Sequence, residues 1–237
     1  MILRLANQFG IAVIEDNAHG LFGTYKGKQL GTFGAMATLS FHETKNYSCG
    51  EGGALLINDP KYVSRAEIIR EKGTDRSRFF RCEVDKYTWV DIGSSYLLSD
   101  MSAAFLLGQL EKHREIRDIR KRIWTNYWEH LRDWAEGNGI GLPQVPKKCA
   151  QAYHMFYLIM PSLAQRLAFI QHLRAAGIMS VFHYVPLHAS PMGLRLSGRT
   201  GTCPVTEDMS DRLVRLPFFN GLSEADQESI ALAAMRF

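Results

Sequence analysis

Two short segments of the 237-residue chain hold the side chains whose types and spacing can do chemistry. The first, residues 15–20, follows an apolar run and contains Asp16; the second, residues 40–53, begins with Ser40 and contains Lys45. Pyridoxal phosphate chemistry requires an amine that forms a Schiff base, a carboxylate for the pyridine nitrogen, and hydroxyl or backbone N–H groups for the phosphate. Lys45, Asp16 and Ser40 are of these three types.

Each of these features also has an ordinary structural interpretation. Asp16 can cap a helix N-terminus, Lys45 can be a surface lysine of a loop, and residues 50–53 (Gly-Glu-Gly-Gly) can be a flexible turn. A Schiff-base lysine must lose its proton, so the pKa of Lys45 would have to fall below its ordinary value of about 10.4. Partial burial and a neighbouring cation have that effect.

The elements that must position these residues are typical of an α/β fold. Residues 2–9 predict an amphipathic helix that ends at Gly10, and residues 11–14 form an apolar run typical of a buried parallel strand. Ligands of such folds bind at the carboxyl ends of strands, where Asp16 follows the run. Further elements are expected as a hairpin at 23–31, strands at 35–41 and 53–57 in a parallel sheet of few members, a helix at 60–72 and a long irregular loop at 73–95.

A long helix is expected from an N-cap at Ser99 to residues 137–139. Its apolar stripe has helical spacing and predicts one buried face, formed by Ile116, Ile119, Ile123, Tyr127, Leu131 and Trp134. The opposite face is rich in basic residues, namely Lys112, Arg114, Arg117, Arg120, Lys121 and Arg122. We interpret it as a solvated face rather than a nucleic-acid surface, because no set of stacking aromatic residues accompanies it.

After a boundary loop at 143–146, strands and helices alternate and predict a sheet covered by helices on one face. The expected elements are strands at 153–160, 179–184 and 214–216, and helices at 163–175, at 205–212 and from Ser223 onward. We therefore expect two domains: an α/β unit at residues 1–115, incomplete at its N-terminal side, and a smaller α+β domain at residues 116–237 that includes the long helix.

Composition excludes several classes of protein. The 28 basic and 24 acidic residues give a net charge of +4, which does not by itself indicate nucleic-acid binding. No apolar run approaches the ~18 residues that a membrane span needs. The four cysteines lie in no C-x-x-C pair and have no zinc-site spacing, so we expect no metal and a reduced, cytoplasmic location: Cys49, Cys82, Cys149 and Cys203.

Several motifs in one order resemble a known family. They are Glu15-Asp16-x-Ala18-His19, Ser40-Phe41-x-x-x-Lys45-Asn46 and Gly50-Glu51-Gly52-Gly53, followed by matching segments at 70–74, 84–89, 91–96, 154–157 and 181–188. From about residue 8 to its C-terminus the chain resembles the DegT/DnrJ/EryC1/StrS sugar aminotransferases. These are fold-type I pyridoxal-phosphate enzymes that act on nucleotide-linked keto sugars. The resemblance implies that fold, with part of its large domain and a C-terminal α+β small domain.

The resemblance also implies roles for individual residues. Lys45 would bind the cofactor covalently and move a proton between the cofactor and C4 of the sugar, while Asp16 would pair with the pyridine nitrogen. His19 would lie near the phenolic oxygen of the cofactor, and Ser40 would contact its phosphate. Ser95 stands where many family members have an asparagine that reaches the cofactor phosphate of the partner subunit. That stretch reads Gly93 to Leu97, Gly-Ser-Ser-Tyr-Leu, where the family has Gly-Phe-Asn-Tyr-Arg.

Other residues keep two interpretations. His183, Tyr184 and His188 would contact the substrate according to the resemblance, or the histidines can be structural. The arginines of the irregular loop can hold a nucleotide diphosphate or be solvated charges: Arg76, Arg78 and Arg81.

The implied reaction transfers an amino group from glutamate to the C4 keto group of a dTDP-4-keto-6-deoxy sugar, for a surface polysaccharide such as enterobacterial common antigen. A homodimer with a shared active site is implied as well. Related dehydratases have histidine in place of the lysine, and Lys45 argues against that reaction. Family members carry a long segment before the position of Met1, with a phosphate-binding turn and a stacking aromatic residue. We therefore also expect weak activity from this chain alone, the alternative being a non-catalytic fragment or oligomerisation remnant.

Overall fold

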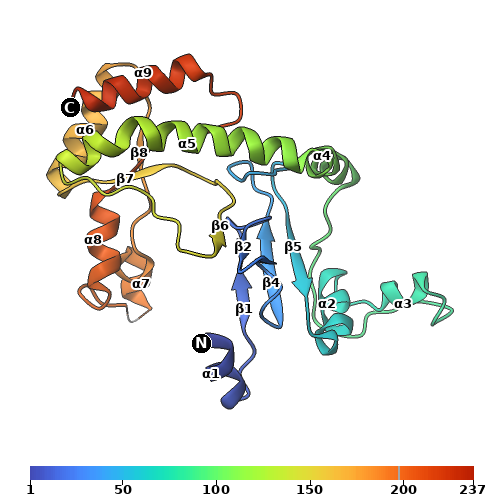
Figure 1. Ribbon diagram of the computed structural model, residues 1–237. Helices are drawn as coiled ribbons and strands as arrows, with labels where there is room; N and C mark the ends of the chain where they lie inside the picture. The colour runs from blue at the N-terminus through green and yellow to red at the C-terminus, as the bar shows by residue number, and fades with distance from the viewer. Residues whose placement is uncertain (197) are drawn as a thin grey trace. The chain divides into compact units, whose positions relative to one another are not determined.

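A computed structural model describes residues 1–196 and 198–237 as two compact units (Figure 1). Unit 1 comprises Met1–His113 and Lys147–Ala152, and unit 2 comprises Arg114–Pro146 and Tyr153–Phe237. This division differs from the expected one, which assigned all of residues 116–237 to the second domain. The physical reason is a short strand, β6 (Cys149–Ala150), which pairs with a strand of unit 1 and was not expected from the sequence.

The central sheet of unit 1 has the order β1-β4-β5, with β1 (Ile14–Asp16), β4 (Met36–Ser40) and β5 (Gly53–Ile57) (Figure 1). Strands β1 and β4 are parallel, with Asp16 opposite Thr38. Strands β4 and β5 are antiparallel, so the expectation of an all-parallel sheet is wrong for β5. A parallel pair needs a long crossover, whereas the loop at residues 41–52 turns the chain straight back onto β4.

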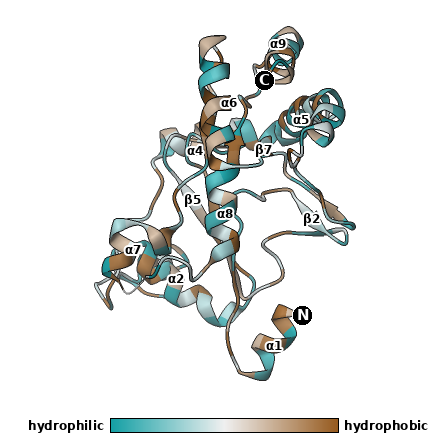
Figure 2. Ribbon diagram, turned by 90° about the vertical axis from the view of Figure 1, so that its left-hand side faces the viewer, coloured by the Kyte–Doolittle hydropathy of each residue, from teal (hydrophilic) through white to brown (hydrophobic). Residues whose placement is uncertain are grey.

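Strand β1 is shorter and more exposed than the sequence predicts. It begins at Ile14 rather than Ile11, and the two residues are 57% and 61% exposed. The reason is its position at one edge of the described sheet, where only β4 pairs with it. Helix α1 (Ile2–Gln8) precedes it and also has exposed apolar side chains, which Figure 2 shows as hydrophobic colour on α1 and the segment after it.

The predicted hairpin is confirmed as β2 (Thr24–Tyr25) and β3 (Lys28–Gln29). Its two turn residues, Lys26 and Gly27, have φ angles of 52° and 77°, as a two-residue turn between antiparallel strands requires. Farther along, the expected helix after residue 60 is a 3-10 turn, η1 (Pro60–Tyr62), followed by α2 (Val63–Arg70). The loop expected to be irregular contains a short helix, α3 (Arg76–Phe80).

The long helix predicted from Ser99 is two helices, α4 (Asp100–Glu111) and α5 (His113–Gly137), separated at Lys112. The cap is confirmed, because the Ser99 hydroxyl accepts a hydrogen bond of 3.2 Å from the backbone N–H of Ser102. Helix α4 buries little of its apolar surface: Leu106 is buried, whereas Met101 and Phe105 are 86% and 63% exposed.

Unit 2 contains α5 and an antiparallel sheet of order β7-β9-β8, formed by β7 (Tyr157–Ile159), β8 (Val181–Phe182) and β9 (Leu213–Arg215). The remaining elements are α6 (Leu163–Ala175), η2 (Leu187–Ala189), α7 (Pro191–Arg195), α8 (Pro204–Arg212) and α9 (Glu224–Met235). The core joins the α5 stripe to β7, α6, β9 and α9 and includes Ile123, Tyr127, Leu131, Phe156, Phe169, Val214 and Ile230.

One residue of the supposedly solvated face of α5 is buried. Arg120 is 6% exposed, and its guanidinium donates hydrogen bonds to the carbonyls of Tyr153 and His154 and to the Asn220 side chain. The interpretation of Arg120 as a solvated charge is therefore wrong, because a planar fork of N–H donors satisfies three acceptors at once. Within the described residues, no helix is long and apolar enough to cross a membrane.

A partly buried carboxylate in β1, that of Glu15, fixes the segment that leads into β4. Glu15 accepts hydrogen bonds from the backbone N–H groups of Gly31, Phe33 and Gly34 at 2.8, 2.6 and 2.7 Å. A Cβ at Gly34 would meet the Val13 carbonyl oxygen at 2.4 Å, so the segment passes close to the chain before β1. Burial opposes the charged form of Glu15, but the three donors outweigh it and hold its pKa below the ordinary value.

We expect Glu15→Gln to lower the free energy of unfolding by about 1–3 kcal/mol, because hydrogen bonds to a charged acceptor are lost. The folded-state pKa of Glu15 is depressed, so its contribution is present above the ordinary value of 4.5 and is lost as the pH falls through the folded value. Thermal unfolding from pH 7 to 3 measures this. The variant should be less stable than the wild type at pH 7, and the two curves should converge toward pH 3. A matched control, the exposed Glu43→Gln, should give the same curve of stability against pH as the wild type. Equal stability of wild type and Glu15→Gln at pH 7 would refute the role of Glu15.

Candidate active site

The carboxyl ends of β1 and β4 bring two of the predicted site residues to one edge of the sheet. Asp16 is the last residue of β1, and Ser40 is the last residue of the parallel neighbour β4. Because Asp16 lies opposite Thr38, Ser40 is two positions farther along the same edge. The hydroxyl oxygen of Ser40 accepts a long hydrogen bond of 3.5 Å from the His42 backbone N–H. Its own O–H can therefore donate to an anion.

Directly after β1 the chain turns back on itself. The Asp16 carboxylate accepts a hydrogen bond of 3.1 Å from the Ala18 backbone N–H, and Gly20 donates to the Asn17 carbonyl. Asn17 is buried and anchors the turn: its backbone N–H donates to the Thr38 carbonyl, and its side chain donates to the Leu30 carbonyl. His19 is exposed in this turn, three residues from Asp16. The helix N-cap interpretation of Asp16 is wrong, since a turn and not a helix follows.

Lys45 lies in the loop of residues 41–52, which we call the lysine loop. Both ends of the loop continue the β4–β5 pairing, through hydrogen bonds from Phe41 N–H to the Gly52 carbonyl and from Glu43 N–H to the Gly50 carbonyl, both 2.8 Å. At its centre the Lys45 backbone N–H donates to the His42 carbonyl at 2.9 Å. The loop therefore has a defined backbone course on either side of the amine, which argues against a flexible turn at residues 50–53.

The sequence does not predict the role of three side chains whose hydrogen bonds hold the lysine loop. Asn46 is buried and donates to the Ala152 carbonyl at 2.6 Å, and the Tyr47 hydroxyl donates to the His113 carbonyl at 3.1 Å. The Gln109 side chain binds the backbone of Ser48. No local motif could have revealed these contacts, because the partners are 61 to 106 positions apart in the sequence.

The side chain of Lys45 is partly buried, and this desolvation lowers the pKa of its ammonium group below the ordinary value. The negative charge of Asp16 acts in the opposite direction and raises the pKa of Lys45, so the two side chains interact electrostatically. The net direction is downward. The Lys45 amine therefore feels the charge of the Asp16 carboxylate and still releases its proton more readily than an ordinary lysine does, which is the requirement for a nucleophilic amine.

The other predicted site residues lie on other segments. Ser95 is exposed and pairs with Glu71 through a backbone bridge of unit 1. His183, Tyr184 and His188 belong to unit 2, where the rings of His183 and Tyr184 are 5.1 Å apart. Their expected contacts with the cofactor or substrate stay predictions.

His188 has a structural partner in unit 2. Its Nε2 lies 2.8 Å from the Glu207 carboxylate, which also accepts a hydrogen bond of 2.7 Å from the Gly201 backbone N–H. The His188 hydrogen bond is the largest of the effects that lower the pKa of Glu207. This contact supports the structural interpretation of His188.

The arginines of the α3 segment are already engaged by carboxylates. Arg81 makes two hydrogen bonds to Glu67 and a third to Glu83, and Arg78 donates to Glu83. Arg76 lies over the ring of Phe80 at 5.0 Å. These ion pairs favour the structural interpretation of the cluster over a diphosphate site, because an anion would have to displace them.

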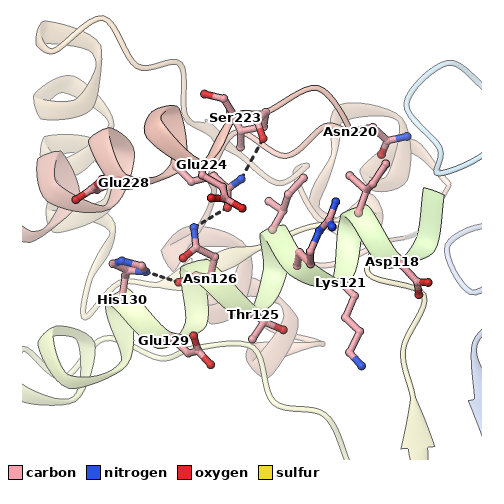
Figure 3. Close-up of a pocket in the computed structure, with 15 residues that line it drawn as sticks. Asp118, Lys121, Thr125, Asn126, Glu129, His130, Asn220, Ser223, Glu224 and Glu228 are labelled. Atoms are coloured by element: carbon pink, nitrogen blue, oxygen red, sulfur yellow. Dashed lines mark hydrogen bonds between the residues drawn. The ribbon is translucent and has the colours of Figure 1, made fainter. Parts of the chain in front are cut away.

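A groove in unit 2 offers a second concave surface. It has a volume of ≈ 1000 Å³ and is lined by residues of α5, of α9 and of the turn between Asn220 and Glu224 (Figure 3). Its floor includes a hydrogen bond of 2.8 Å from the Asn126 side chain to Gln227. None of the predicted site residues lines the groove. Across the described ranges 1–196 and 198–237, His, Cys, Asp and Glu side chains form no cluster of three that could hold a metal ion.

Residues 1–235 match the model of the DegT/DnrJ/EryC1/StrS aminotransferase family. The chain belongs to this family. It is 31% identical over 239 residues to the GDP-perosamine synthase of Caulobacter vibrioides, covering 98% of this chain and 60% of that protein. It is also 29% identical over 232 residues to the uncharacterized protein MJ1066 of Methanocaldococcus jannaschii, covering 95% of this chain and 59% of that protein.

Solved structures agree with this membership. A DegT DnrJ EryC1 StrS aminotransferase from Brucella abortus superposes with a TM-score of 0.84 at 29% identity, over 98% of this chain and 59% of that one. DesV of S. venezuelae gives a TM-score of 0.88 at 26% identity, over 99% and 60%. The chain therefore spans about 60% of the length of the relatives it matches and has the corresponding part of their fold.

We expect Lys45 to titrate below the ordinary pKa of a lysine side chain; Lys86, an exposed lysine of unit 1, is followed beside it. Asp16→Asn should lower the titration midpoint of Lys45 further, because the carboxylate that raises its pKa is gone. Trace labelling with isotope-coded acetic anhydride across pH 7–12, followed by peptide mass spectrometry, measures both midpoints.

Lys86 in the same digests is the internal control and should not respond to Asp16→Asn. A Lys45 midpoint at the ordinary lysine value, or one that rises in Asp16→Asn, would contradict the electrostatic description of the site.

Proposed function

We propose that this chain is the lysine-bearing part of a pyridoxal-phosphate-dependent aminotransferase that acts on a nucleotide-linked keto sugar. The observation that carries the proposal is the electrostatic interaction of Lys45, in the loop after β4, with Asp16 at the sheet edge that also holds Ser40. Family membership supports it, since the family consists of aminotransferases. Because the chain spans about 60% of its relatives, the activity of the whole protein is part of the proposal.

The residues present fit the cofactor. Lys45 would bind its carbonyl carbon, Asp16 its pyridine nitrogen and Ser40 its phosphate, and each has the donor, acceptor or charge needed for that group. His19, on the turn after Asp16, would lie toward the phenolic oxygen, and Ser95 would serve the phosphate of the partner subunit. When bound, pyridoxal phosphate supplies a carbonyl that reacts with amines and a ring that withdraws electrons from the bond to be broken.

The chain itself would supply positioning and proton transfer. Desolvation keeps the amine of Lys45 more easily neutral, so the amine can accept a proton from carbon and return it. The Asp16 carboxylate, held by the Ala18 N–H, would keep a positive charge at the ring nitrogen favourable. Backbone hydrogen bonds from Phe41 to Gly52 and from Glu43 to Gly50 fix both ends of the lysine loop. They limit how far the amine moves between binding the cofactor and transferring a proton.

For the substrate, we propose a dTDP-4-keto-6-deoxy sugar, with glutamate as the amino donor. The amino sugar formed would be used to build a surface polysaccharide such as enterobacterial common antigen. The segments at 40–46, 84–89 and 181–188 are similar to those of dTDP-4-amino-4,6-dideoxygalactose transaminases, which supports this choice. The name of the relative from Caulobacter vibrioides contains GDP instead, so the nucleotide needs its own test. His183, Tyr184 and His188 would contact the sugar nucleotide.

We also propose a cytoplasmic homodimer with a shared active site, in which unit 2 corresponds to the small domain of the family. The exposed apolar side chains of α4, among them Met101 and Phe105, support a partner surface. The second candidate is a non-catalytic fragment or oligomerisation remnant. The observation that favours it is coverage of about 60% of the relatives' length.

The purified chain, incubated with pyridoxal phosphate and glutamate, should release 2-oxoglutarate faster than free pyridoxal phosphate does. Lys45→Ala should lower this rate by roughly 100-fold or more, because general acid–base catalysis alone contributes about that factor. The exposed Lys86→Ala is the matched control and should keep the wild-type rate. Equal rates for wild type, Lys45→Ala and free cofactor would support the fragment alternative over the aminotransferase.

Nucleotide choice can be measured separately. Protection of the chain from thermal unfolding by dTDP but not by GDP is the expected result. Stabilisation by GDP alone would overturn the dTDP assignment while leaving the aminotransferase proposal standing.

A further inference from the structure

The break between α4 and α5 coincides with the attachment point of the lysine loop. The sequence predicts one continuous helix here, yet α4 ends at Glu111 and α5 begins at His113. At the break, His113 Nδ1 lies 2.8 Å from the Leu110 carbonyl oxygen. The residues on either side of it, Gln109 and His113, contact the loop three and two positions after Lys45.

The side chain of Gln109 satisfies both backbone groups of Ser48. Its Nε2 donates to the Ser48 carbonyl at 2.6 Å, and its Oε1 accepts from the Ser48 N–H at 3.1 Å. A carboxamide offers one donor and one acceptor side by side, so it binds the loop as a neighbouring strand would. A glutamate at this position could only accept, and a leucine could do neither.

An aromatic contact completes the attachment. Tyr47 is 3% exposed, donates to the His113 carbonyl, and packs edge-on against Phe22 with ring centroids 5.2 Å apart. Phe22 in turn stacks on the His113 ring at 4.6 Å. Tyr47 is therefore tied to the first residue of α5 and Ser48 to the last turn of α4, while the β4–β5 ladder holds both ends of the loop.

We propose that Gln109 is a positioning residue for Lys45: by pinning Ser48 to α4, it keeps the amine partly desolvated and beside Asp16. The role of that amine in catalysis rests on the proposed function, but its position does not. Without the carboxamide, the Ser48 N–H and carbonyl must find water, and the loop moves away from α4 to let water in. The amine of Lys45 then becomes better solvated and behaves like a surface lysine.

Three variants test this on the cofactor-free chain: Gln109→Glu, Gln109→Leu and Tyr47→Phe, with the exposed Gln171→Leu of α6 as the control. The readouts are the titration midpoint of Lys45 by trace acetylation and hydrogen exchange of the loop amides. We expect the Lys45 midpoint to rise by about 0.5 pH unit or more toward the ordinary lysine value in Gln109→Leu. Gln109→Glu keeps an acceptor and should loosen the loop less, but its added negative charge also raises the pKa of a nearby lysine, so this variant is judged by hydrogen exchange. Gln171→Leu should change neither readout.

The exchange of the Ser48 and Lys45 amides should accelerate more in Gln109→Leu than in Gln109→Glu. Tyr47→Phe removes one hydroxyl and should produce a smaller change in the same direction, so it remains informative where Gln109→Leu fails to fold. An unchanged Lys45 midpoint in the folded Gln109 variants would overturn the proposal. If the chain released no 2-oxoglutarate from glutamate but the Lys45 midpoint still shifted in the Gln109 variants, the proposed function would be refuted. The positioning role of Gln109 would stand.

Discussion

The antiparallel ladder between β4 and β5 is the constraint on which the candidate site depends. It pairs Met36 with Ile57 at one end and Ser40 with Gly53 at the other, and hydrogen bonds of the lysine loop extend it beyond the strands. Closing a loop costs conformational entropy. The backbone hydrogen bonds of the ladder offset this cost, so the loop's own side chains are not needed to close it. The side-chain contacts of Asn46, Tyr47 and Gln109 can then act on a loop whose ends are already fixed.

Strand β4 also connects the amine to its counter-charge. Its other edge pairs in parallel with β1, so the ends of the two strands carry Asp16 and Ser40 to the start of the lysine loop. Two opposing effects act on Lys45, and desolvation outweighs the attraction of Asp16. Asp16 is exposed, so solvent screens its field, whereas the lysine side chain is partly buried. The result is an amine beside a carboxylate without a tight ion pair that would hold its proton.

The sequence predicts local features of this fold well. The hairpin at Lys26-Gly27, the strand at 53–57, the helix at 163–175 and the cap at Ser99 follow from turn chemistry, apolar periodicity and capping preferences. These signals lie within a few residues of the elements they specify. The Lys45, Asp16 and Ser40 set was predicted because family motifs and residue chemistry both point to it.

What the sequence does not reveal depends on distant partners. No glycine or proline lies between Gln109 and Glu115, and the helix nevertheless separates at Lys112, where Gln109 and His113 contact the lysine loop. Arg120 resembles its solvated neighbours on α5, but its acceptors at Tyr153 and His154 lie more than 30 positions away. The exposure of β1 reflects its edge position, and the antiparallel direction of β5 reflects the backbone pairing between the two ends of the loop before it.

The central claim is that Lys45 is the amine of this chain that reacts with the cofactor. The most direct test is to mix the purified chain with pyridoxal phosphate, reduce with borohydride, and locate the modified lysine by peptide mass spectrometry. Our account predicts a single dominant label on Lys45 that disappears in Lys45→Ala. Labelling scattered over exposed lysines, and unchanged in that variant, would contradict it.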